Sequence, residues 1–431
     1  MDNTVGPVGN TLWLIVEKLA FMTVSLVVSL LMARHLQPAG FGELSFLLAA
    51  VSLLAPIMAL GLNSLIAREL LRRSDDHASI IGTAVTLRLI SGLLVAGIAG
   101  LTSILWLPSE QRVLFSLLAF ASVANAMLVV DFWLQAKSAN YYAVVVRLSV
   151  LVIVSSGRVA AVWLDAGLEV FIYIACMEWV LSGMFYALAY RTLGGPLRQL
   201  RATLAEGRHL VRDARWLWFT AMSAVLTLKV DQLMLGIILD ERAVGVYAAA
   251  VRLSEVWYVL PAAIVTGFFP QLVTVKEANP KAYWRSLQQL NDVLFVSAIA
   301  IAVLVTALAA WLVPFLYGLS YTAAADILVL HVWAGVFVFT SSLLNRWLII
   351  EGSLRLALGV QVAGATTNIL LNIWLIPKYG AFGAALATLV SASVSGYFVL
   401  FFHQKLRPMA RLMSGSFTIP FRLMKRIYQR S

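Results

Sequence analysis

Charged residues and cysteines are scarce in this 431-residue chain. Only 12% of its residues are charged, whereas a soluble protein of this size carries roughly a quarter, and 61% are hydrophobic. The single cysteine, Cys176, excludes a disulfide framework, and the five histidines show no metal-ligand spacing. Neither a Walker A sequence nor a nucleophile elbow is present, so no motif indicates ATP hydrolysis or acyl transfer.

The hydrophobic residues form continuous runs of about 20, the length of a helix that crosses a bilayer. Runs without period-two alternation argue against a transmembrane β-barrel. The first run is too long for a signal-peptide core, so we interpret it as a retained helix. We therefore predict an all-α polytopic membrane protein with twelve spans. They are expected at 12–33, 43–66, 80–106, 113–135, 143–164, 168–190, 215–239, 245–273, 287–317, 323–350, 355–376 and 381–402.

Basic residues set the predicted orientation. The net charge is +11, and of the 32 Lys and Arg residues seven fall within spans, four in one set of loops, and 21 in the other set and the C-terminal tail. Cytoplasmic loops carry such an excess, so both termini are predicted to be cytoplasmic. Because this placement explains the positive charge, we expect no nucleic-acid partner.

The longest internal polar stretch, residues 191–215, holds six arginines and divides the spans six and six. Such a basic segment is typical of an amphipathic helix that lies on anionic headgroups. We predict an N-terminal six-helix bundle at 1–190, this cytoplasmic linker, a C-terminal six-helix bundle at 216–402 and a basic cytoplasmic tail at 403–431. Pro56 and Pro261 lie inside predicted spans and are expected to kink them.

Ionisable residues within the spans are the candidate functional residues. A charge at the bilayer centre costs about 2.5–3.5 kcal/mol, so such residues are expected to face a cavity, pair, or reach an interface. Arg147 and Arg158 are 11 residues apart, which returns them to one helix face. From the thirteen ionisable residues within the spans we select seven as candidates: Arg147, Arg158, Lys229 and Arg252 among the cations, and Asp131, Asp231 and Glu255 among the acids.

Four of these candidates lie in the apolar hairpin 227–261, which opens the second half of the chain. Lys229 and Asp231 are two residues apart and point to different sides of a helix, so they cannot easily pair. Arg252 and Glu255 are three apart on one face, where a simple salt bridge is an alternative to a functional role. The hairpin is therefore the first place to look for function.

Near the C-terminus, residues 368–388 read N-x-x-L-N-x-x-L-I-P-x-Y-G-x-x-G-A-A-x-A-T. Pro377 is expected to end one helix, Gly380 permits a turn, and Gly383 with its alanines forms a small face. Helix packing alone accounts for most of this motif.

As a pattern, the same motif resembles the Wzx family of polysaccharide flippases, within the MOP exporter superfamily. Two further stretches resemble that family: D-x-x-M-L-G…V-G-x-Y-A-A-A-x-R at 231–252, and A-R-x-L-x-P-x-x-F-G at 33–42. Of the candidate residues, only Asp231 and Arg252 occupy positions that belong to the family's sequence pattern. The resemblance covers most of the chain, and none of its motifs is catalytic.

The resemblance implies a MATE-like, V-shaped pair of six-helix bundles around a central cavity, and a transporter rather than an enzyme. The expected activity is alternating-access transfer of undecaprenyl-pyrophosphate-linked oligosaccharide across the bacterial inner membrane, for surface polysaccharide assembly. No cofactor is implied beyond a proton or sodium gradient, and candidate partners are a polysaccharide polymerase and a chain-length regulator. We assign substrate binding to Arg158, Lys229, Arg252 and Arg147, and ion pairing or coupling to Asp231, Glu255 and Asp131.

Three alternatives stay open. A cation-coupled drug antiporter of the same superfamily would need acids to dominate its N-terminal cavity, yet Asp131 and Glu178 are matched by Arg88, Arg147 and Arg158. A lipid II flippase would be expected to have more than twelve spans. A polysaccharide polymerase or ligase would need a sizeable outer loop, whereas the predicted outer loops have about ten residues or fewer.

Overall fold

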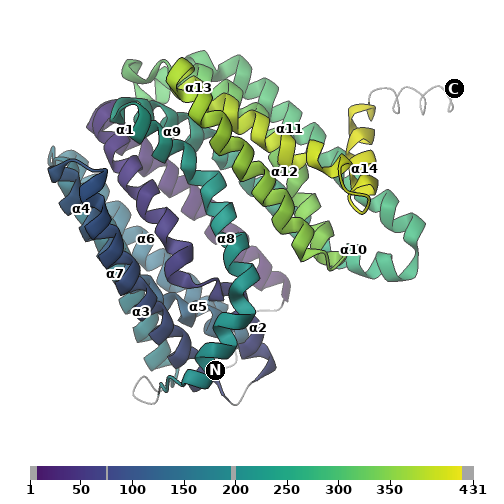
Figure 1. Cartoon of the computed structure of the whole chain (residues 1–431), viewed down its shortest axis with the longest axis horizontal. Coiled ribbons are helices and arrows are strands. Elements are labelled where there is room, and N and C mark those ends of the chain that lie inside the picture. Colours follow the sequence, from purple (N-terminus) through teal and green to yellow (C-terminus); the bar gives the residue numbers. More distant parts are fainter. Residues whose placement is uncertain (1–6, 74–75, 196–199, 420–431) are drawn as a thin grey trace. The chain divides into compact units, whose positions relative to one another are not determined.

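The computed structural model describes residues 7–73, 76–195 and 200–419, and over these residues it is helical and without strands. Figure 1 follows the helices along the chain. Contacts divide the chain into an N-terminal unit, Met1–Lys229, and a C-terminal unit, Val230–Ser431. The boundary lies inside a helix, at Lys229, whereas the sequence analysis placed it in the segment 191–215.

The N-terminal unit contains the first seven α-helices, two short 3-10 helices and most of the eighth α-helix. Their bounds are α1 Pro7–Ala59, α2 Leu62–Arg72, α3 His77–Thr102, η1 Ser103–Leu105, α4 Ser109–Ala121, η2 Ser122–Leu128, α5 Val129–Ala136, α6 Asn140–Trp163, α7 Leu168–Thr192 and α8 Leu204–Ile238. Helix α1 packs against α3 and α6, and α7 packs against α4 and α6.

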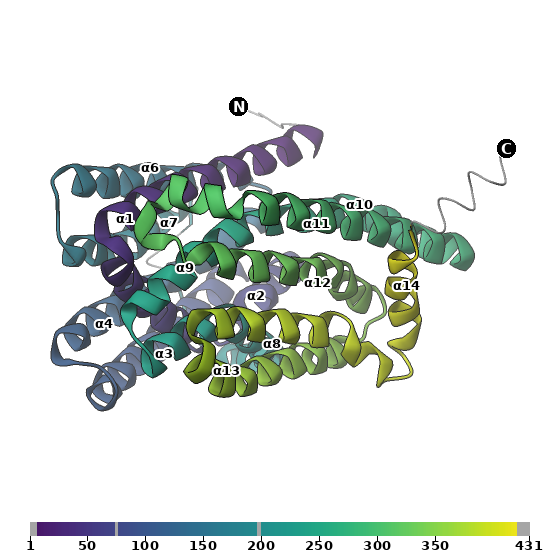
Figure 2. The same ribbon diagram turned by 90° about the horizontal axis from the view of Figure 1, so that it is seen from above.

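The C-terminal unit is arranged around one central helix. Its elements are the end of α8, α9 Glu241–Glu255, η4 Val256–Tyr258, α10 Val259–Ala278, α11 Pro280–Tyr317, η5 Leu319–Tyr321, α12 Ala324–Ile350, α13 Leu354–Gly396, η6 Phe398–Phe401 and α14 Arg407–Phe417. Helix α12 contacts α9, α10, α11 and α13. Figure 2 shows α11, α12 and α13 running side by side.

Within the described residues, ten helices are long and apolar enough to cross a membrane. Two of them bend at a residue with non-helical dihedral angles, Gln37 in α1 and Gly380 in α13. Each bent helix covers two predicted spans, so the ten helices account for all twelve. The chain is therefore a multi-pass membrane protein of all-α fold, as predicted.

The second predicted span, 43–66, is wrong at its C-terminal end. Helix α1 stops at Ala59, Leu60 and Gly61 both have positive φ, and α2 begins at Leu62. Gly61 has φ 67° and a Cβ there would lie 2.5 Å from the backbone nitrogen of Trp218, so only glycine fits. Hydropathy did not detect the break because both flanking segments are apolar.

Of the two predicted proline kinks, one coincides with a break in the helix. Pro261 follows the 3-10 turn Val256–Tyr258, and its missing N–H leaves the carbonyl of Trp257 without a helical partner. Pro56 lies in the last turn of α1 and keeps helical dihedral angles, so the helix is not broken at Pro56.

The predicted basic segments contain helix. Residues 204–215 form the first turns of α8, whose Leu210 and Ala214 are buried in the core of the N-terminal unit. In the tail, α14 packs against α11, and the Ser416 hydroxyl donates to Asp292 (2.6 Å) and accepts from Asn291 (2.8 Å). Residues 196–199 and 420–431 lie outside the described part.

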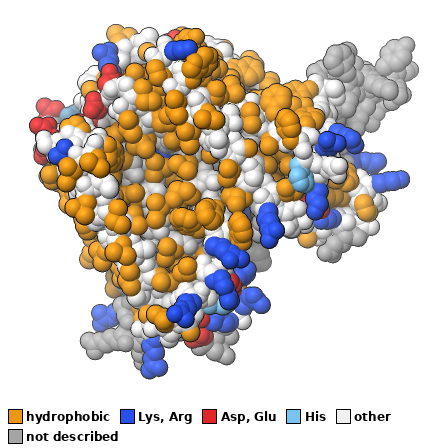
Figure 3. Space-filling view, in the orientation of Figure 1, with side chains coloured by type: hydrophobic (Ala, Val, Ile, Leu, Met, Phe, Trp, Pro, Cys, Tyr) orange, Lys and Arg blue, Asp and Glu red, His pale blue; other side chains and the backbone are white. Residues whose placement is uncertain are grey.

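Hydrophobic side chains cover most of the face drawn in Figure 3, and Lys and Arg gather toward its edges. Large apolar residues such as Leu105, Phe402 and Leu319 are more than four-fifths exposed. Exposed apolar surface of this extent fits contact with lipid tails.

Candidate functional site

One carboxyl group, that of Asp231, is completely enclosed in the C-terminal unit. Asp231 lies near the end of α8 and is 3% exposed. Its Oδ2 accepts hydrogen bonds from the Tyr247 hydroxyl (2.6 Å) and the Thr388 hydroxyl (2.5 Å), and its Oδ1 accepts one from Asn372 Nδ2 (2.5 Å). Asn372 Nδ2 also donates to Asn368 Oδ1 at 3.1 Å. We call these five residues the Asp231 cluster.

The bend in α13 brings two of its segments to the same carboxylate. Asn368 and Asn372 are one helical turn apart before the bend, and Thr388 lies after it. Gly380 has φ 59° at the bend, and a Cβ on Gly383 would lie 2.4 Å from the Leu375 carbonyl oxygen. The two glycines of the C-terminal motif are therefore what allows both segments of α13 to reach Asp231.

The Asp231 cluster contains no cationic side chain among the described residues. A charge buried this deeply is expensive unless it is compensated, and hydroxyl and amide donors compensate it only partly. Asn368 Nδ2 and Asn372 Oδ1 are buried without a hydrogen-bond partner. Carboxylate, amide and hydroxyl oxygens are the ligands that hard cations take, so the cluster can accept a proton or a small cation.

In the N-terminal unit, Arg147 and Asp131 form an ion pair. Arg147 Nη1 lies 2.9 Å from Asp131 Oδ1. The buried Tyr186 hydroxyl donates to the same oxygen at 3.2 Å, and Gln135 donates to Asp131 Oδ2 at 3.0 Å. Asp131, on the short helix α5, is thereby held by α6 and α7 at once.

A second ion pair joins Arg158 to Glu178. Arg158 Nη2 lies 2.6 Å from Glu178 Oε2, while Arg158 Nε is buried without a hydrogen-bond partner. Arg147 and Arg158 do share α6 as predicted, but each pairs with an acid on a different helix.

Members of both pairs line one cavity of about 310 Å³, which we call the Arg147 cavity. Asp131, Arg147 and Glu178 contribute its charged groups, and Asn63 and Tyr186 lie on its wall. It can therefore present positive and negative groups to a polar solute.

The remaining predicted residues, Lys229, Arg252 and Glu255, lie on α8 and α9. Lys229 is half-exposed on α8 and has no hydrogen bond or ion pair with any residue the structure describes. As predicted, it does not pair with Asp231, which is buried. Arg252 and Glu255 are half-buried in the last turn of α9, before η4.

One further ion pair joins α2 to the start of α8. Arg73 bonds to Glu206 and also lies 3.4 Å from Glu69. The hydrogen bond with Glu206 raises the pKa of Arg73 above its ordinary value. The pair fixes the basic segment to the N-terminal unit.

The sequence analysis missed most partners of the predicted acids. Asn368, Asn372 and Thr388 were attributed to helix packing, and Tyr186 and Tyr247 were not considered. The available signal was the presence of two asparagines four residues apart inside an apolar run, which places both amides on one helix face.

The family model described as "Polysaccharide biosynthesis protein" matches residues 8–276. Two curated relatives from Haloferax volcanii are similar: "Probable flippase AglR", 25% identical over 254 residues, and "Probable low-salt glycan biosynthesis flippase Agl15", 22% identical over 223 residues. These matches cover 55% and 50% of this chain and 49% and 46% of the relatives. The chain thus spans about half the length of the curated relatives it matches.

Two solved structures share the fold across nearly the whole chain. The lipid II flippase MurJ, in an inward closed conformation, has a TM-score of 0.72 at 13% identity, covering 95% of this chain and 92% of its own. An inward-facing multidrug resistance MATE family transporter of the MOP superfamily has a TM-score of 0.64 at 16% identity, covering 90% and 95%. At these identities, the likeness concerns the fold alone.

Proposed function

Because the chain belongs to the polysaccharide biosynthesis protein family, we propose that it is a flippase for lipid-linked oligosaccharide. The substrate would be an undecaprenyl-pyrophosphate-linked repeat unit, moved across the bacterial inner membrane by alternating access for assembly of a surface polysaccharide. The names of the two curated relatives support a flippase in glycan assembly. Under this proposal both termini are cytoplasmic, and a polysaccharide polymerase and a chain-length regulator act on the repeat unit after its transfer.

The observation that carries the proposal is the Arg147 cavity. Two arginines of one helix, Arg147 and Arg158, are kept inside an apolar bundle, each against a carboxylate. Arginine binds phosphate through paired, charge-assisted hydrogen bonds with the same fork that it uses for carboxylate. A diphosphate therefore replaces Asp131 and Glu178 as the partner of the arginines, and the acids take them back after release.

In this proposal Lys229 and Arg252 add positive charge to the substrate path, and the Asp231 cluster couples transport to a proton or sodium gradient. Asp231 suits this role because its ligands come from both sides of the α13 bend. Occupation of the carboxyl by a proton or cation would change those hydrogen bonds, and with them the geometry of α13. Glu255 and Asp131 serve as ion-pair partners.

A cation-coupled drug antiporter is the second candidate, favoured by the MATE-like fold. It needs free acids in the N-terminal unit to hold a cationic drug. Asp131 and Glu178 are instead both paired with arginine. The charge pattern therefore favours an anionic substrate.

The test is transfer of a fluorescent undecaprenyl-pyrophosphate oligosaccharide across proteoliposomes that contain the full chain. A membrane-impermeant glycosidase reports how much label has reached the outer leaflet. We expect transfer by the wild type and little by Arg147→Gln. Arg112→Gln is the control, because within the described part of the chain Arg112 bonds to the Leu107 and Ile104 carbonyls and to no acid. Absence of transfer by the wild type, together with efflux of a cationic dye, would favour the antiporter.

A further inference from the structure

One buried arginine lies outside the groups assigned above. Arg88 is on α3, about 17 Å from the start of the helix at 1.5 Å per residue, and is 4% exposed. Arg88 is thus near the middle of the 26-residue helix α3. Its Nη2 donates to Asn63 Oδ1, and its Nε is buried without a hydrogen-bond partner. No carboxylate neutralises Arg88 within the described residues.

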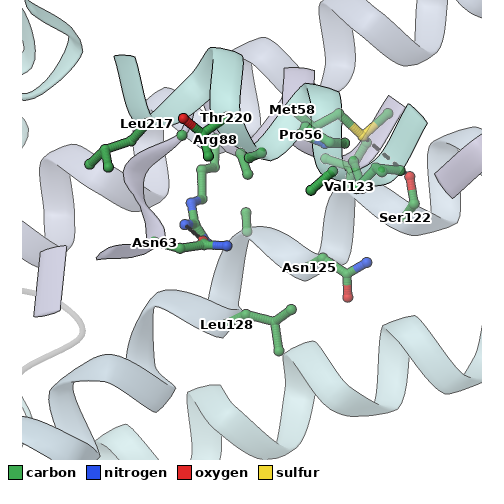
Figure 4. A pocket seen from close by; sticks show the side chains of 17 residues that line it. Pro56, Met58, Asn63, Arg88, Ser122, Val123, Asn125, Leu128, Leu217 and Thr220 are labelled. Atoms are coloured by element: carbon green, nitrogen blue, oxygen red, sulfur yellow. Dashed lines mark hydrogen bonds between the residues drawn. The ribbon is translucent and has the colours of Figure 1, made fainter. Parts of the chain in front are cut away.

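Arg88 faces a cavity of about 470 Å³ in the N-terminal unit, which we call the Arg88 cavity. Figure 4 shows its guanidinium beside Asn63, with Asn125, Ser122 and Thr220 also on the wall. None of the described residues that line this cavity is an Asp or a Glu. The rest of its wall is mostly apolar and comes from Pro56, Met58, Val123, Leu128, Leu217 and Val225.

The cavity thus combines one uncompensated cation with an apolar wall. Burying the charge of Arg88 is unfavourable, and within the described residues its side-chain hydrogen-bond partner is the amide of Asn63. An anion that enters repays this cost through charge-assisted bonds, and the apolar wall prefers a hydrocarbon chain. A soluble anion would bind the Arg88 guanidinium but would make no favourable contact with the apolar wall.

We propose that the Arg88 cavity binds the phosphate group of an anionic lipid, with the guanidinium on the phosphate and the lipid chain along the apolar wall. Asn63 and Asn125 donate further hydrogen bonds to the phosphate oxygens. The lipid is either the polyprenyl diphosphate of the transport substrate, which rests on the proposed function, or a membrane phospholipid, which does not.

The Arg88 cavity adjoins the Arg147 cavity, because Asn63 and Leu128 line both. Asn63 is exposed and is the hydrogen-bond partner of Arg88. A phosphate group that leaves Arg147 can therefore bind next to Arg88, the hydrogen-bond partner of Asn63. For the substrate, the two cavities are successive positions of the diphosphate.

The test measures lipid binding to the purified full chain by native mass spectrometry. The probes are undecaprenyl diphosphate, phosphatidylglycerol, undecaprenol and inorganic pyrophosphate. We expect the phosphate-bearing lipids to bind and undecaprenol to bind weakly. Arg88→Gln should weaken the binding by about 10–100-fold, which corresponds to the loss of a charged hydrogen bond. The control Arg112→Gln should bind as the wild type.

A second variant separates binding from folding. Asn63→Asp places a carboxylate beside Arg88, so it should raise the thermal unfolding midpoint while it abolishes binding of phosphate-bearing lipids. Unchanged lipid binding in Arg88→Gln or in Asn63→Asp would overturn the proposal, because Arg88 would then serve the fold alone. Inorganic pyrophosphate that binds as tightly as undecaprenyl diphosphate would also overturn it.

The two lipid sources give different results. If Arg88→Gln weakens undecaprenyl diphosphate but not phosphatidylglycerol, the ligand is the substrate carrier. If it weakens phosphatidylglycerol alone, the cavity holds a membrane phospholipid. The purified chain could bind phosphate-bearing lipid in an Arg88-dependent way and yet transfer no oligosaccharide in proteoliposomes. That result would support the lipid site at Arg88 and refute the proposed flippase function.

Discussion

At the scale of residues, the ionisable side chains within the spans differ in how they are neutralised. Arg147 and Arg158 have carboxylate partners, Asp231 has only neutral donors, and Arg88 has one amide. An ion pair persists until a substrate competes for one of its two members. An ionised group with neutral hydrogen-bond partners can instead bind a counter-ion directly. The two kinds of group therefore differ in whether a ligand must first displace a charged partner.

The coupling role predicts a specific defect in Asp231→Asn. The variant keeps the size of the side chain and one carbonyl oxygen, but it loses the negative charge and the second acceptor oxygen that the Tyr247, Thr388 and Asn372 donors share. We expect transfer to fall about tenfold or more, since hydrogen bonds to a charged group contribute roughly 1.5–3 kcal/mol, and the remaining transfer to ignore an imposed proton or sodium gradient.

Asp240→Asn is the matched control for this prediction. Asp240 caps α9 by accepting from the Ala243 N–H, and asparagine caps helices equally well. Gradient-dependent transfer that persists in Asp231→Asn would place the coupling group elsewhere.

The exchange of partners at Arg147 predicts that stability and transfer separate. Arg147→Gln leaves Asp131 without its cation, so the free energy of unfolding should fall by about 1–3 kcal/mol. Adding Asp131→Asn should restore stability, because neither charge remains, yet leave transfer as low as in the single variant. Chemical denaturation and the proteoliposome assay measure the two quantities. Recovery of transfer in the double variant would mean that the pair is only structural.

At the scale of elements, the bend of α13 decides where the Asp231 cluster forms. The sequence predicted the turn at Gly380 from the backbone freedom of glycine, and this is confirmed by its φ of 59°. The sequence did not predict that Asn372 and Thr388 share a carboxylate. That contact depends on how close the two segments of α13 approach, which Gly383 sets through a contact that spacing alone does not encode.

Two glycines of α13 should therefore respond in opposite ways to the same substitution. Gly383→Ala should destabilise the chain by about 1–3 kcal/mol, because the new methyl group meets the Leu375 backbone. Gly359 has open space around its Cβ position, so Gly359→Ala should raise helix stability by up to about 1 kcal/mol. Thermal unfolding in detergent compares the two, and an equal shift for both would contradict a tight bend.

The attachment of α14 gives a second prediction for an element. Ser416 links α14 to Gln288, Asn291 and Asp292 of α11. Ser416→Ala removes the acceptor for the Nδ2 of the buried Asn291, while Gln288 and Asp292 keep their hydrogen bond to each other. We therefore expect a loss of about 1–3 kcal/mol and faster proteolysis of the tail. Ser393→Ala is the control, since its hydroxyl bonds only within its own helix. Equal proteolysis of both variants would show that apolar packing alone holds α14.

At the scale of the whole molecule, hydropathy predicted the number of membrane crossings better than their ends. Each of the twelve predicted spans overlaps a helix that is long and apolar enough to cross a membrane, because run length is a property of the sequence alone. The break at Leu60–Gly61 depends on a tertiary contact with Trp218, and the end of α8 carries Asp231 into the C-terminal unit. Neither feature alters local hydropathy. Pairings such as Arg158–Glu178 likewise require knowledge of which helices are neighbours.

The predicted orientation of the chain is testable with its single cysteine replaced. In a Cys176→Ser background, Ala205→Cys at the start of α8 and Leu319→Cys between α11 and α12 are predicted to lie on opposite sides of the membrane. Both positions are exposed. We expect an impermeant maleimide to label Leu319→Cys in intact cells and Ala205→Cys only after lysis. The reverse pattern would place both termini outside the cytoplasm.

The two unpartnered amide atoms of the Asp231 cluster imply a switch made of side-chain rotations. Asn372 directs its N–H group to an ionised Asp231, the orientation that suits an acceptor. Once that oxygen carries a proton it becomes a donor, and Asn372 satisfies it only by turning its amide through half a rotation. Asn368 must then turn as well, so that its free Nδ2 reaches the rotated oxygen. Protonation of Asp231 would therefore rotate the side-chain amides of Asn372 and Asn368, one helical turn apart on α13.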